Sequence, residues 1–204
     1  MVVGVAALVV GYVLAVWTRS GQGLENAALR GADQVRDEDF ARANDSLHAI
    51  TMGSLVASMV LVGVIALARR RWDLAVAGVG VIVLGQVLAQ GLKRFVLPRP
   101  ELVDVVGDYT DNSFPSGHTT IAMTVMFALI LVVPYRARGI MMFFVVPWAL
   151  AIGGYTITAK WHRLSDTVGA MAIALICACL ASWWLSRRGD VRPFPGRAFP
   201  GRVV

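Results

Sequence analysis

Six apolar segments fill most of this chain, and no other feature of the sequence constrains the fold as strongly. They cover residues 2–17, 47–68, 74–97, 119–134, 140–159 and 167–185. A helix that crosses a bilayer needs roughly 20 apolar residues, and only the first and fourth segments fall somewhat short of that length. Hydrophobic residues make up 57% of the 204 positions, so a soluble bundle would have almost no polar surface left. The sequence therefore predicts an all-α protein, a bundle of six transmembrane helices.

The bundle is expected to form one membrane domain, residues 1–188, followed by a tail at 189–204. The first apolar segment has no basic stretch before it and no convincing small-residue cleavage site, so we expect a retained helix rather than a signal peptide. In the tail, Phe-Pro-Gly-Arg occurs twice, at 194–197 and 199–202. Such closely spaced Pro-Gly pairs exclude a helix, and we predict a disordered, basic tail at the cytoplasmic surface.

The placement of Lys and Arg predicts the orientation of the bundle. One set of segment ends, together with the tail, holds ten of the 19 basic residues: Arg69, Arg70, Arg71, Arg136, Arg138, Arg187, Arg188, Arg192, Arg197 and Arg202. Only Asp73 and Asp190 accompany them, and short basic loops stay on the cytoplasmic side. We therefore expect a multi-pass protein of the cell's plasma or inner membrane, with both termini in the cytoplasm. The net charge of +6 is explained by topology, so we expect no nucleic-acid partner.

A polar stretch, residues 20–46, separates the first two apolar segments. It holds three Arg and six acidic residues, and Leu24, Ala28, Gly31 and Val35 recur in it at helical spacing. We expect an amphipathic extracytoplasmic helix with these four residues on its apolar face. Two interpretations stay open: a solvated helix that caps the bundle, or an interfacial helix beside a lipid entry path.

Three clusters of polar residues lie at the edges of the apolar segments, on the expected extracytoplasmic side. In the first, Pro115-Ser116-Gly117-His118 precedes an apolar run. Proline and glycine interrupt the chain and serine is a favoured N-cap, so a helix is expected to begin here. The free N–H groups of a helix start bind anions, and His118 would face the bound anion. An ordinary turn with an interfacial histidine is the alternative.

The second cluster is His162 and Asp166, four residues apart near the start of the last apolar segment. Residues at this spacing share one face of a helix. A carboxylate beside an imidazole fixes its tautomer and leaves the other ring nitrogen free to attack an electrophile. The alternative is a structural cap, although an ionisable residue near membrane depth is costly and favours a functional role.

The third cluster, Lys93, Arg94 and Arg99, ends the third apolar segment. Long basic side chains often anchor a helix at the membrane interface, and this explains Arg94 well. It explains Arg99 less well, because this residue is held between Pro98 and Pro100. A planar guanidinium held in one direction suits bidentate phosphate binding, and a lysine adds a point charge.

Together the clusters resemble the pattern of the type 2 phosphatidic acid phosphatase superfamily of integral-membrane lipid phosphatases. That pattern joins a Lys to Arg-Pro, then has Pro-Ser-Gly-His, and then Ser-Arg leading to His-x-x-x-Asp. The matching residues are Lys93, Arg99, Pro100, Pro115, Ser116, Gly117, His118, His162 and Asp166. The motifs span residues 93–166, and the six-segment layout extends the resemblance over nearly the whole chain.

Two departures from the family pattern concern its basic residues. Five residues separate Lys93 from Arg99, one fewer than is usual in the family. The Ser-Arg pair of the third motif would fall on Tyr155-Thr156, so the arginine that binds phosphate in the family is absent from its place. Lys160 and Arg163, on either side of His162, are candidate substitutes.

The resemblance implies a metal-independent phosphoric monoester or diphosphate hydrolase that needs no cofactor. In this mechanism His162 attacks phosphorus, Asp166 orients it, His118 protonates the leaving oxygen, and water then cleaves the phosphohistidine. The phosphate ligands would be Lys93, Arg99, Ser116 and the backbone N–H of Gly117. The expected partners are a lipid phosphate substrate and membrane lipid, and we find no carboxylate cluster suited to a metal.

Other functions remain compatible with the sequence. A phosphotransferase would use the same phosphohistidine but pass the phosphate to an acceptor other than water. The missing arginine at Thr156 also leaves room for a non-catalytic lipid-phosphate binder or a flippase-like protein. Among substrates, polyprenyl pyrophosphate, phosphatidylglycerol phosphate, phosphatidate and a polyprenyl-phosphosugar phosphate all fit.

Overall fold

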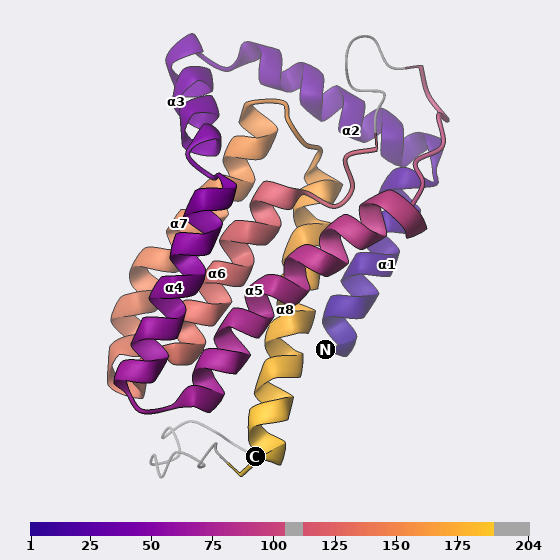
Figure 1. Cartoon of the computed structure of the whole chain (residues 1–204). Coiled ribbons are helices and arrows are strands. Elements are labelled where there is room, and N and C mark those ends of the chain that lie inside the picture. The colour runs from indigo at the N-terminus through magenta and orange to yellow at the C-terminus, as the bar shows by residue number, and fades with distance from the viewer. Residues whose placement is uncertain (105–111, 190–204) are drawn as a thin grey trace, which may run out of the picture.

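The computed structural model describes residues 1–104 and 112–189, and every regular element within these ranges is helical (Figure 1). The α-helices are α1 (Val2–Val16), α2 (Arg19–Gly31), α3 (Asp37–His48), α4 (Met52–Ala68), α5 (Trp72–Gly91), α6 (Gly117–Val132), α7 (Arg138–Thr158) and α8 (Leu164–Arg187). Shorter elements join some of them: η1 (Ala32–Gln34), the π-helical turn η2 (Leu92–Val96) and η3 (Tyr135–Ala137). The all-α prediction is confirmed for these ranges. The predicted tail lies outside the described residues, apart from Gly189.

The six predicted apolar segments correspond to α1 and to α4 through α8. Within the described residues, three elements are long and apolar enough to cross a membrane: α5 with η2, η3 with α7, and α8. Two bent pairs, α1 with α2 and η1, and α3 with α4, raise that number to five if each pair is one span, and α6 is a shorter apolar helix. The structure thus supports a multi-pass membrane protein with three to five candidate spans, and the count of six stays a prediction.

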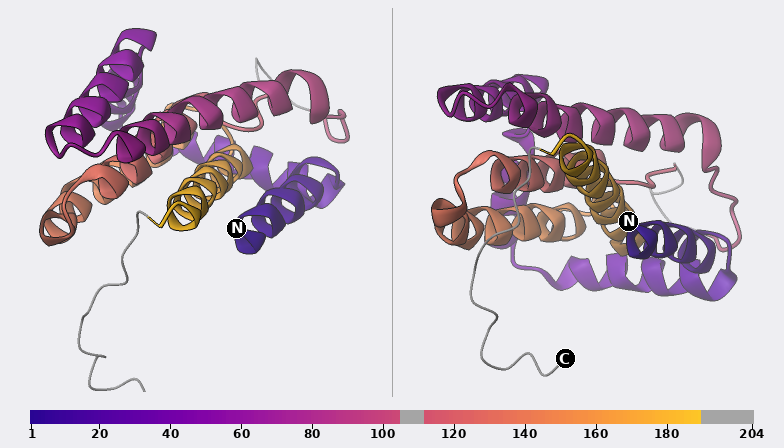
Figure 2. Two further views of the ribbon diagram at one scale, coloured as in Figure 1. Left: turned by 60° about the horizontal axis from the view of Figure 1, so that its bottom comes forward. Right: turned by 90° about the horizontal axis from the view of Figure 1, so that it is seen from below.

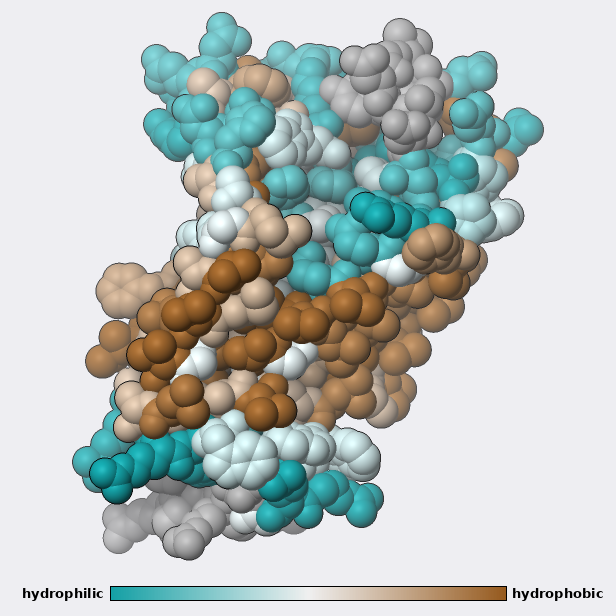
Figure 3. All heavy atoms as spheres, in the orientation of Figure 1, coloured by the Kyte–Doolittle hydropathy of each residue, from teal (hydrophilic) through white to brown (hydrophobic). Residues whose placement is uncertain are grey.

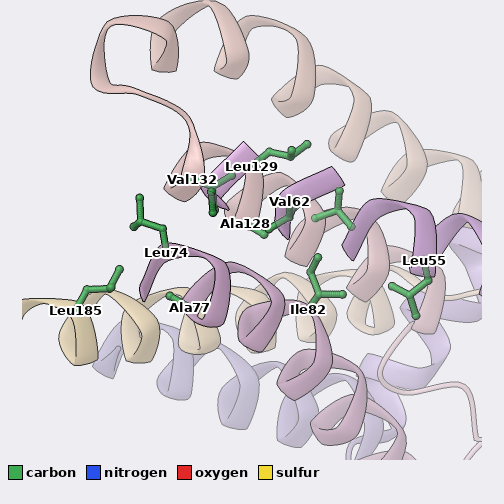
Figure 4. Packing of buried hydrophobic residues seen from close by; sticks show 11 residues of the cluster. Leu55, Val62, Leu74, Ala77, Ile82, Ala128, Leu129, Val132 and Leu185 are labelled. Atoms are coloured by element: carbon green, nitrogen blue, oxygen red, sulfur yellow. The ribbon is translucent and has the colours of Figure 1, made fainter. Parts of the chain in front are cut away.

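Helix α6 lies at the centre of the bundle, where it packs against α4, α5, α7 and α8. Viewed from the end opposite α2, α8 lies between α5 and α1 (Figure 2). Val62 from α4, Ile82 from α5, and Ala128 and Val132 from α6 meet in one buried cluster (Figure 4). A Cβ on Gly78 of α5 would lie 2.6 Å from Val62 and 2.8 Å from Val132. The helices therefore approach closely at a small residue, which is how helices associate in lipid.

The polar stretch at 20–46 forms two helices, α2 and α3, at one end of the bundle (Figure 1). In α2, Leu24 and Ala28 of the predicted apolar face are exposed, so this face does not pack against the bundle. The helix instead buries Gln22, Glu25, Asn26 and Leu29. Gln22 and Glu25 tolerate burial because they hydrogen-bond to the chain after η2 and to the start of α8. The stretch therefore caps the bundle through polar contacts that its own sequence does not show.

An apolar band separates two polar ends of the molecule (Figure 3). One end carries α2, α3 and the chain that follows η2. The other carries the turn between α4 and α5 and the end of α8, with basic residues at 69–71 and 187–188. The loop between η2 and α6 contains no helix in its described parts, 98–104 and 112–115. The three polar clusters of the sequence therefore meet under α2, at the end of the apolar band.

Candidate active site

Helix α6 begins where the sequence predicts. Ser116 is its N-cap, with an extended backbone, and its hydroxyl accepts a hydrogen bond from the N–H of Thr119 at 3.3 Å. The side chain of Ser116 is fully buried, whereas Gly117 and His118 are partly exposed. The hydroxyl still has a proton to donate, and the N–H of Gly117 lies in the unpaired first turn of the helix. This helix start therefore offers donors and a positive dipole end to an anion.

His162 and Asp166 are in contact, with Nδ1 and Oδ2 3.3 Å apart. His162 precedes α8 rather than lying within it, yet its ring reaches the first turn of the helix. Asp166 is fully buried, and the same Oδ2 accepts from Ser113 Oγ at 2.5 Å and from the N–H of Arg163 at 2.9 Å. With Nδ1 donating to this fixed carboxylate, Nε2 of His162 keeps its lone pair and is the nucleophilic atom.

The loop before α6 is fixed on both sides. Asn112 Nδ2 donates to the carbonyls of Lys93 at 3.1 Å and Leu97 at 2.6 Å, which ties the loop to η2. The buried ring of Phe114 rests on α8 at Gly169, where a Cβ would lie 2.5 Å from the ring. The N–H of Ser116 donates to the backbone carbonyl of Asp166 at 3.0 Å. The first and second clusters are thus joined through the backbone as well as through side chains.

His118 belongs to the same group of side chains as His162. It is within electrostatic range of His162 and Lys93, and Lys93 is within range of Asp166. Its ring packs edge-on against Trp161, with ring centroids 5.1 Å apart. Lys93 is carried by η2, at the end of α5. Two imidazoles and an ammonium group therefore gather at one place, as the motifs predict.

Arg99 reaches this end of the bundle, where it is paired with Glu25, an acidic residue outside the three polar clusters. Its Nη2 lies 3.3 Å from Oε2 of Glu25, and each of the two side chains is only 6% exposed. The other oxygen of Glu25 accepts from the N–H of Ser165 at 3.0 Å. Helix α2 is thereby attached to the residue expected to bind phosphate and to the start of α8.

The two candidate substitutes for the missing arginine differ in their surroundings. Lys160 forms an ion pair with Asp33 of η1. Arg163 is 3% exposed, and its Nη1 donates to Ser113 Oγ at 3.2 Å, next to Asp166. Thr156 is fully buried, and its hydroxyl lies 3.2 Å from that of Thr167 where α7 meets α8. Of the two candidates, Arg163 is therefore the one linked to the carboxylate of Asp166, through Ser113.

The assembled groups suit an oxyanion. In the described part of the chain, no three His, Cys, Asp or Glu side chains gather closely enough to hold a metal ion. What gathers instead are two histidines, one buried carboxylate, Lys93, two guanidinium groups and a helix start. Such donors stabilise negative charge that spreads over the oxygens of a phosphoryl group in its transition state.

Comparison with known proteins agrees with the motifs. A profile of the PAP2 superfamily matches residues 72–190, more than half of the 204 residues. This chain belongs to the PAP2 superfamily. Its structure is similar to that of the first transmembrane PAP2 type phosphatidylglycerolphosphate phosphatase from Bacillus subtilis, with a TM-score of 0.72, 19% identity, and coverage of 95% of this chain and 100% of that chain. At this identity the similarity establishes a shared PAP2 fold. A search of curated proteins finds no match.

Membership in the PAP2 superfamily confirms the resemblance read from the motifs and supports phosphatase activity on a lipid phosphate. The matched region contains all nine motif residues but begins after α1, α2 and α3. Glu25 and Asp33, which hold Arg99 and Lys160, lie outside it. A signal for Glu25 was present in the sequence, because it is an acidic residue in a stretch that also supplies Gln22 and Asn26 at helical spacing.

We expect Arg163 to take the part of the arginine that position 156 lacks. Arg163→Ala should lower kcat/KM by about 10²-fold or more, the loss typical of removing one oxyanion donor. Lys160→Ala should have a much smaller effect, because its ammonium group is engaged by Asp33. Initial rates of phosphate release from a short-chain lipid phosphate, on variants with matched thermal stability, measure the difference.

The variant Arg163→Lys tests the geometry of this contact, because a lysine keeps the charge but cannot bind two oxygens at once. It should recover only part of the loss. Near-normal kinetics in Arg163→Ala would refute the assignment, and a large loss confined to Lys160→Ala would transfer the role to the lysine.

Proposed function

We propose that this PAP2 protein is a lipid phosphate phosphohydrolase that works through a phosphohistidine on His162. The observation that carries the proposal is the buried carboxylate of Asp166. It accepts three hydrogen bonds on one oxygen, and one of the groups in contact with that oxygen is Nδ1 of His162. A carboxylate in this position orients the ring and stabilises the positive charge that the ring gains when Nε2 attacks.

The reaction has two steps. First, Nε2 of His162 forms a bond to phosphorus while the bond from phosphorus to the lipid oxygen breaks, and His118 donates a proton to that oxygen. Second, water attacks the phosphohistidine, gives its proton to His118, and the P–N bond breaks to release phosphate. Each step returns His118 to the protonation state that the next step needs. The lipid alcohol and inorganic phosphate are the products.

The charge of the transferring group is held by cations and backbone donors. Lys93, Arg99 and Arg163 supply positive charge, and Ser116 and the N–H of Gly117 supply hydrogen bonds at the start of α6. The charge spreads over three equatorial oxygens in the transition state, so several fixed donors are needed. We infer that these groups make the reaction independent of a metal ion and of a cofactor.

We further propose that the substrate is a lipid and that the site faces the outside of the cell. The site lies at the polar end of an apolar band (Figure 3), where a lipid phosphate meets protein while its tails stay in the bilayer. The opposite end is rich in arginine, and the positive-inside rule assigns that end to the cytoplasm. We therefore place the site at the extracytoplasmic face. Phosphatidylglycerol phosphate is our first candidate substrate, because the similar Bacillus subtilis protein is a phosphatidylglycerolphosphate phosphatase.

Phosphate release by detergent-purified protein is the direct test. We expect turnover of short-chain phosphatidylglycerol phosphate, and we expect equal rates with and without EDTA, since no step of the mechanism requires a metal. Vanadate should inhibit, because it adopts the geometry of the phosphoryl transition state. Complete loss in EDTA that magnesium restores would replace this mechanism, and no turnover of any lipid phosphate would favour a non-catalytic binder.

Loss of the nucleophile should be nearly complete. In His162→Ala, turnover should fall by roughly 10⁴-fold or more, as it does when a residue of a catalytic unit is removed. His48→Ala is the matched control. His48 is an exposed histidine near the site, and it packs against Trp161 with ring centroids 5.0 Å apart, as His118 does. Rapid denaturation during turnover should trap an acid-labile phosphoryl label on wild-type protein and none on His162→Ala. Residual activity above about 1% would exclude His162 as the nucleophile.

Labelling of single cysteines in intact cells tests the orientation. In a variant whose native Cys177 and Cys179 are replaced by alanine, a cysteine at Glu38 on α3 should react with a membrane-impermeant maleimide. A cysteine at Arg70, in the turn between α4 and α5, should react only after the cells are opened. Both positions are exposed in the structure, so access to the reagent decides the result. The reverse pattern would turn the site toward the cytoplasm.

A further inference from the structure

Three polar side chains beneath α2 are buried without all of the hydrogen-bond partners they need. Within the described residues, both amide atoms of Asn26, the Oγ of Ser165 and the Nη1 of Arg99 have no partner. Asn26 is 6% exposed and Ser165 is 7% exposed, and the side chain of Arg99 is 6% exposed. Buried polar groups are almost always paired, so several unpaired ones near a candidate site call for a partner from outside the chain, either water or a ligand.

Glu25 connects two of these residues directly, and Asn26 is its neighbour in the chain. One oxygen of Glu25 contacts Arg99 and the other accepts from the N–H of Ser165. Asn26 follows Glu25 on the buried face of α2, and two turns later Asp33 pairs with Lys160. Asn26 therefore falls between two attachments to the segment 160–165, which contains His162. Figure 1 shows α2 crossing the end of the bundle there.

The three groups differ in the kind of ligand that each can bind. The free N–H of Arg99 is a cationic donor, and the proposed function already uses it for phosphate. Asn26 and Ser165 are neutral, and each can both donate and accept a hydrogen bond. A hydroxyl group has the same two capacities, so these side chains match the hydroxyls of a polyol better than they match an anion.

The charge of Glu25 argues against a second phosphate in this position. Its carboxylate lies between Arg99 and the start of α8 and already neutralises part of the charge of Arg99. The leaving group of a diphosphate is itself a phosphate, and beneath α2 it would meet this buried carboxylate. Like charges at short range in a partly desolvated site repel each other strongly.

We propose that Asn26 and Ser165 form a subsite for a hydroxyl group on the leaving alcohol, next to the phosphate bound by Arg99. The proposal rests on the phosphohydrolase function and narrows its substrate class. The substrate is a lipid whose phosphate monoester is carried by a polyol head group. Phosphatidate, whose leaving diacylglycerol has no free hydroxyl beside the ester, and prenyl diphosphates satisfy the subsite less well.

Soluble phosphate esters test the subsite on the unmodified protein. Glycerol phosphate and propyl phosphate have the same three-carbon chain and differ in their hydroxyls. Glycerol phosphate should inhibit turnover of a lipid phosphate at a concentration at least about 10-fold below the one needed with propyl phosphate. A site built to bond a hydroxyl discriminates against an analogue that lacks it. Equal inhibition by the two esters would overturn the subsite while leaving the phosphatase function intact.

A substitution locates the effect. Asn26→Leu should lower kcat/KM for short-chain phosphatidylglycerol phosphate about 10-fold, the effect of removing roughly one buried hydrogen bond. It should leave kcat/KM for short-chain phosphatidate unchanged. Asn44→Leu makes the same exchange on α3 and should alter neither substrate.

The outcomes distinguish the two levels of the proposal. An equal loss on both substrates in Asn26→Leu, or a wild-type protein that prefers a prenyl diphosphate, would mean that Asn26 has only a structural role. If the folded wild-type protein releases phosphate from none of these lipids, the phosphatase function itself fails, and the subsite fails with it.

Discussion

The carboxylate of Asp166 ties together segments that are far apart in the sequence, and the geometry of the whole site depends on it. Its Oδ2 contacts Ser113 from the loop before α6, His162 from the turn before α8 and the N–H of Arg163, while its backbone carbonyl accepts from Ser116. Burying a carboxylate is costly unless it is hydrogen-bonded, and this oxygen has three partners. His162, the helix start and the loop are therefore all positioned by contacts to one buried residue.

The membrane environment explains why this network lies where it does. Helices α4 through α8 present mostly apolar side chains and pack through small residues such as Gly78. Charged groups are costly within such a bundle, so they collect at its two ends. At the end that holds the site, α2 covers them and supplies Glu25 and Asp33, each paired with a basic residue. The bundle thus supplies rigidity, and the segment between its first two apolar helices supplies the polar surroundings.

Much of this arrangement could be predicted, because it depends on local patterns. Apolar runs indicated α1 and α4 through α8, the Pro-Ser-Gly-His motif located the N-cap at Ser116, and a spacing of four brought His162 to Asp166. The pairing of Arg99 with Glu25 could not be predicted, since 74 residues separate them and the local sequence around each does not indicate its partner. The buried face of α2 could not be predicted for the same reason: hydrophobic periodicity indicates the apolar side with Leu24, whereas distant partners bury the polar side with Gln22 and Glu25. The π-helical turn that carries Lys93 has no clear signal in the sequence either.

The contact between Phe114 and Gly169 has a consequence for the depth of the site. The phenyl ring occupies the space that any side chain at position 169 would need, so the tip of the ring lies directly against the backbone of α8. Gly169 is three residues further along α8 than Asp166, and both hold the same loop. The tilt of α8 and its depth in the membrane therefore set the distance between the site and the hydrocarbon region. A bilayer that changes the tilt of this helix would raise or lower the chemistry relative to the lipid head groups without altering any bond within the site.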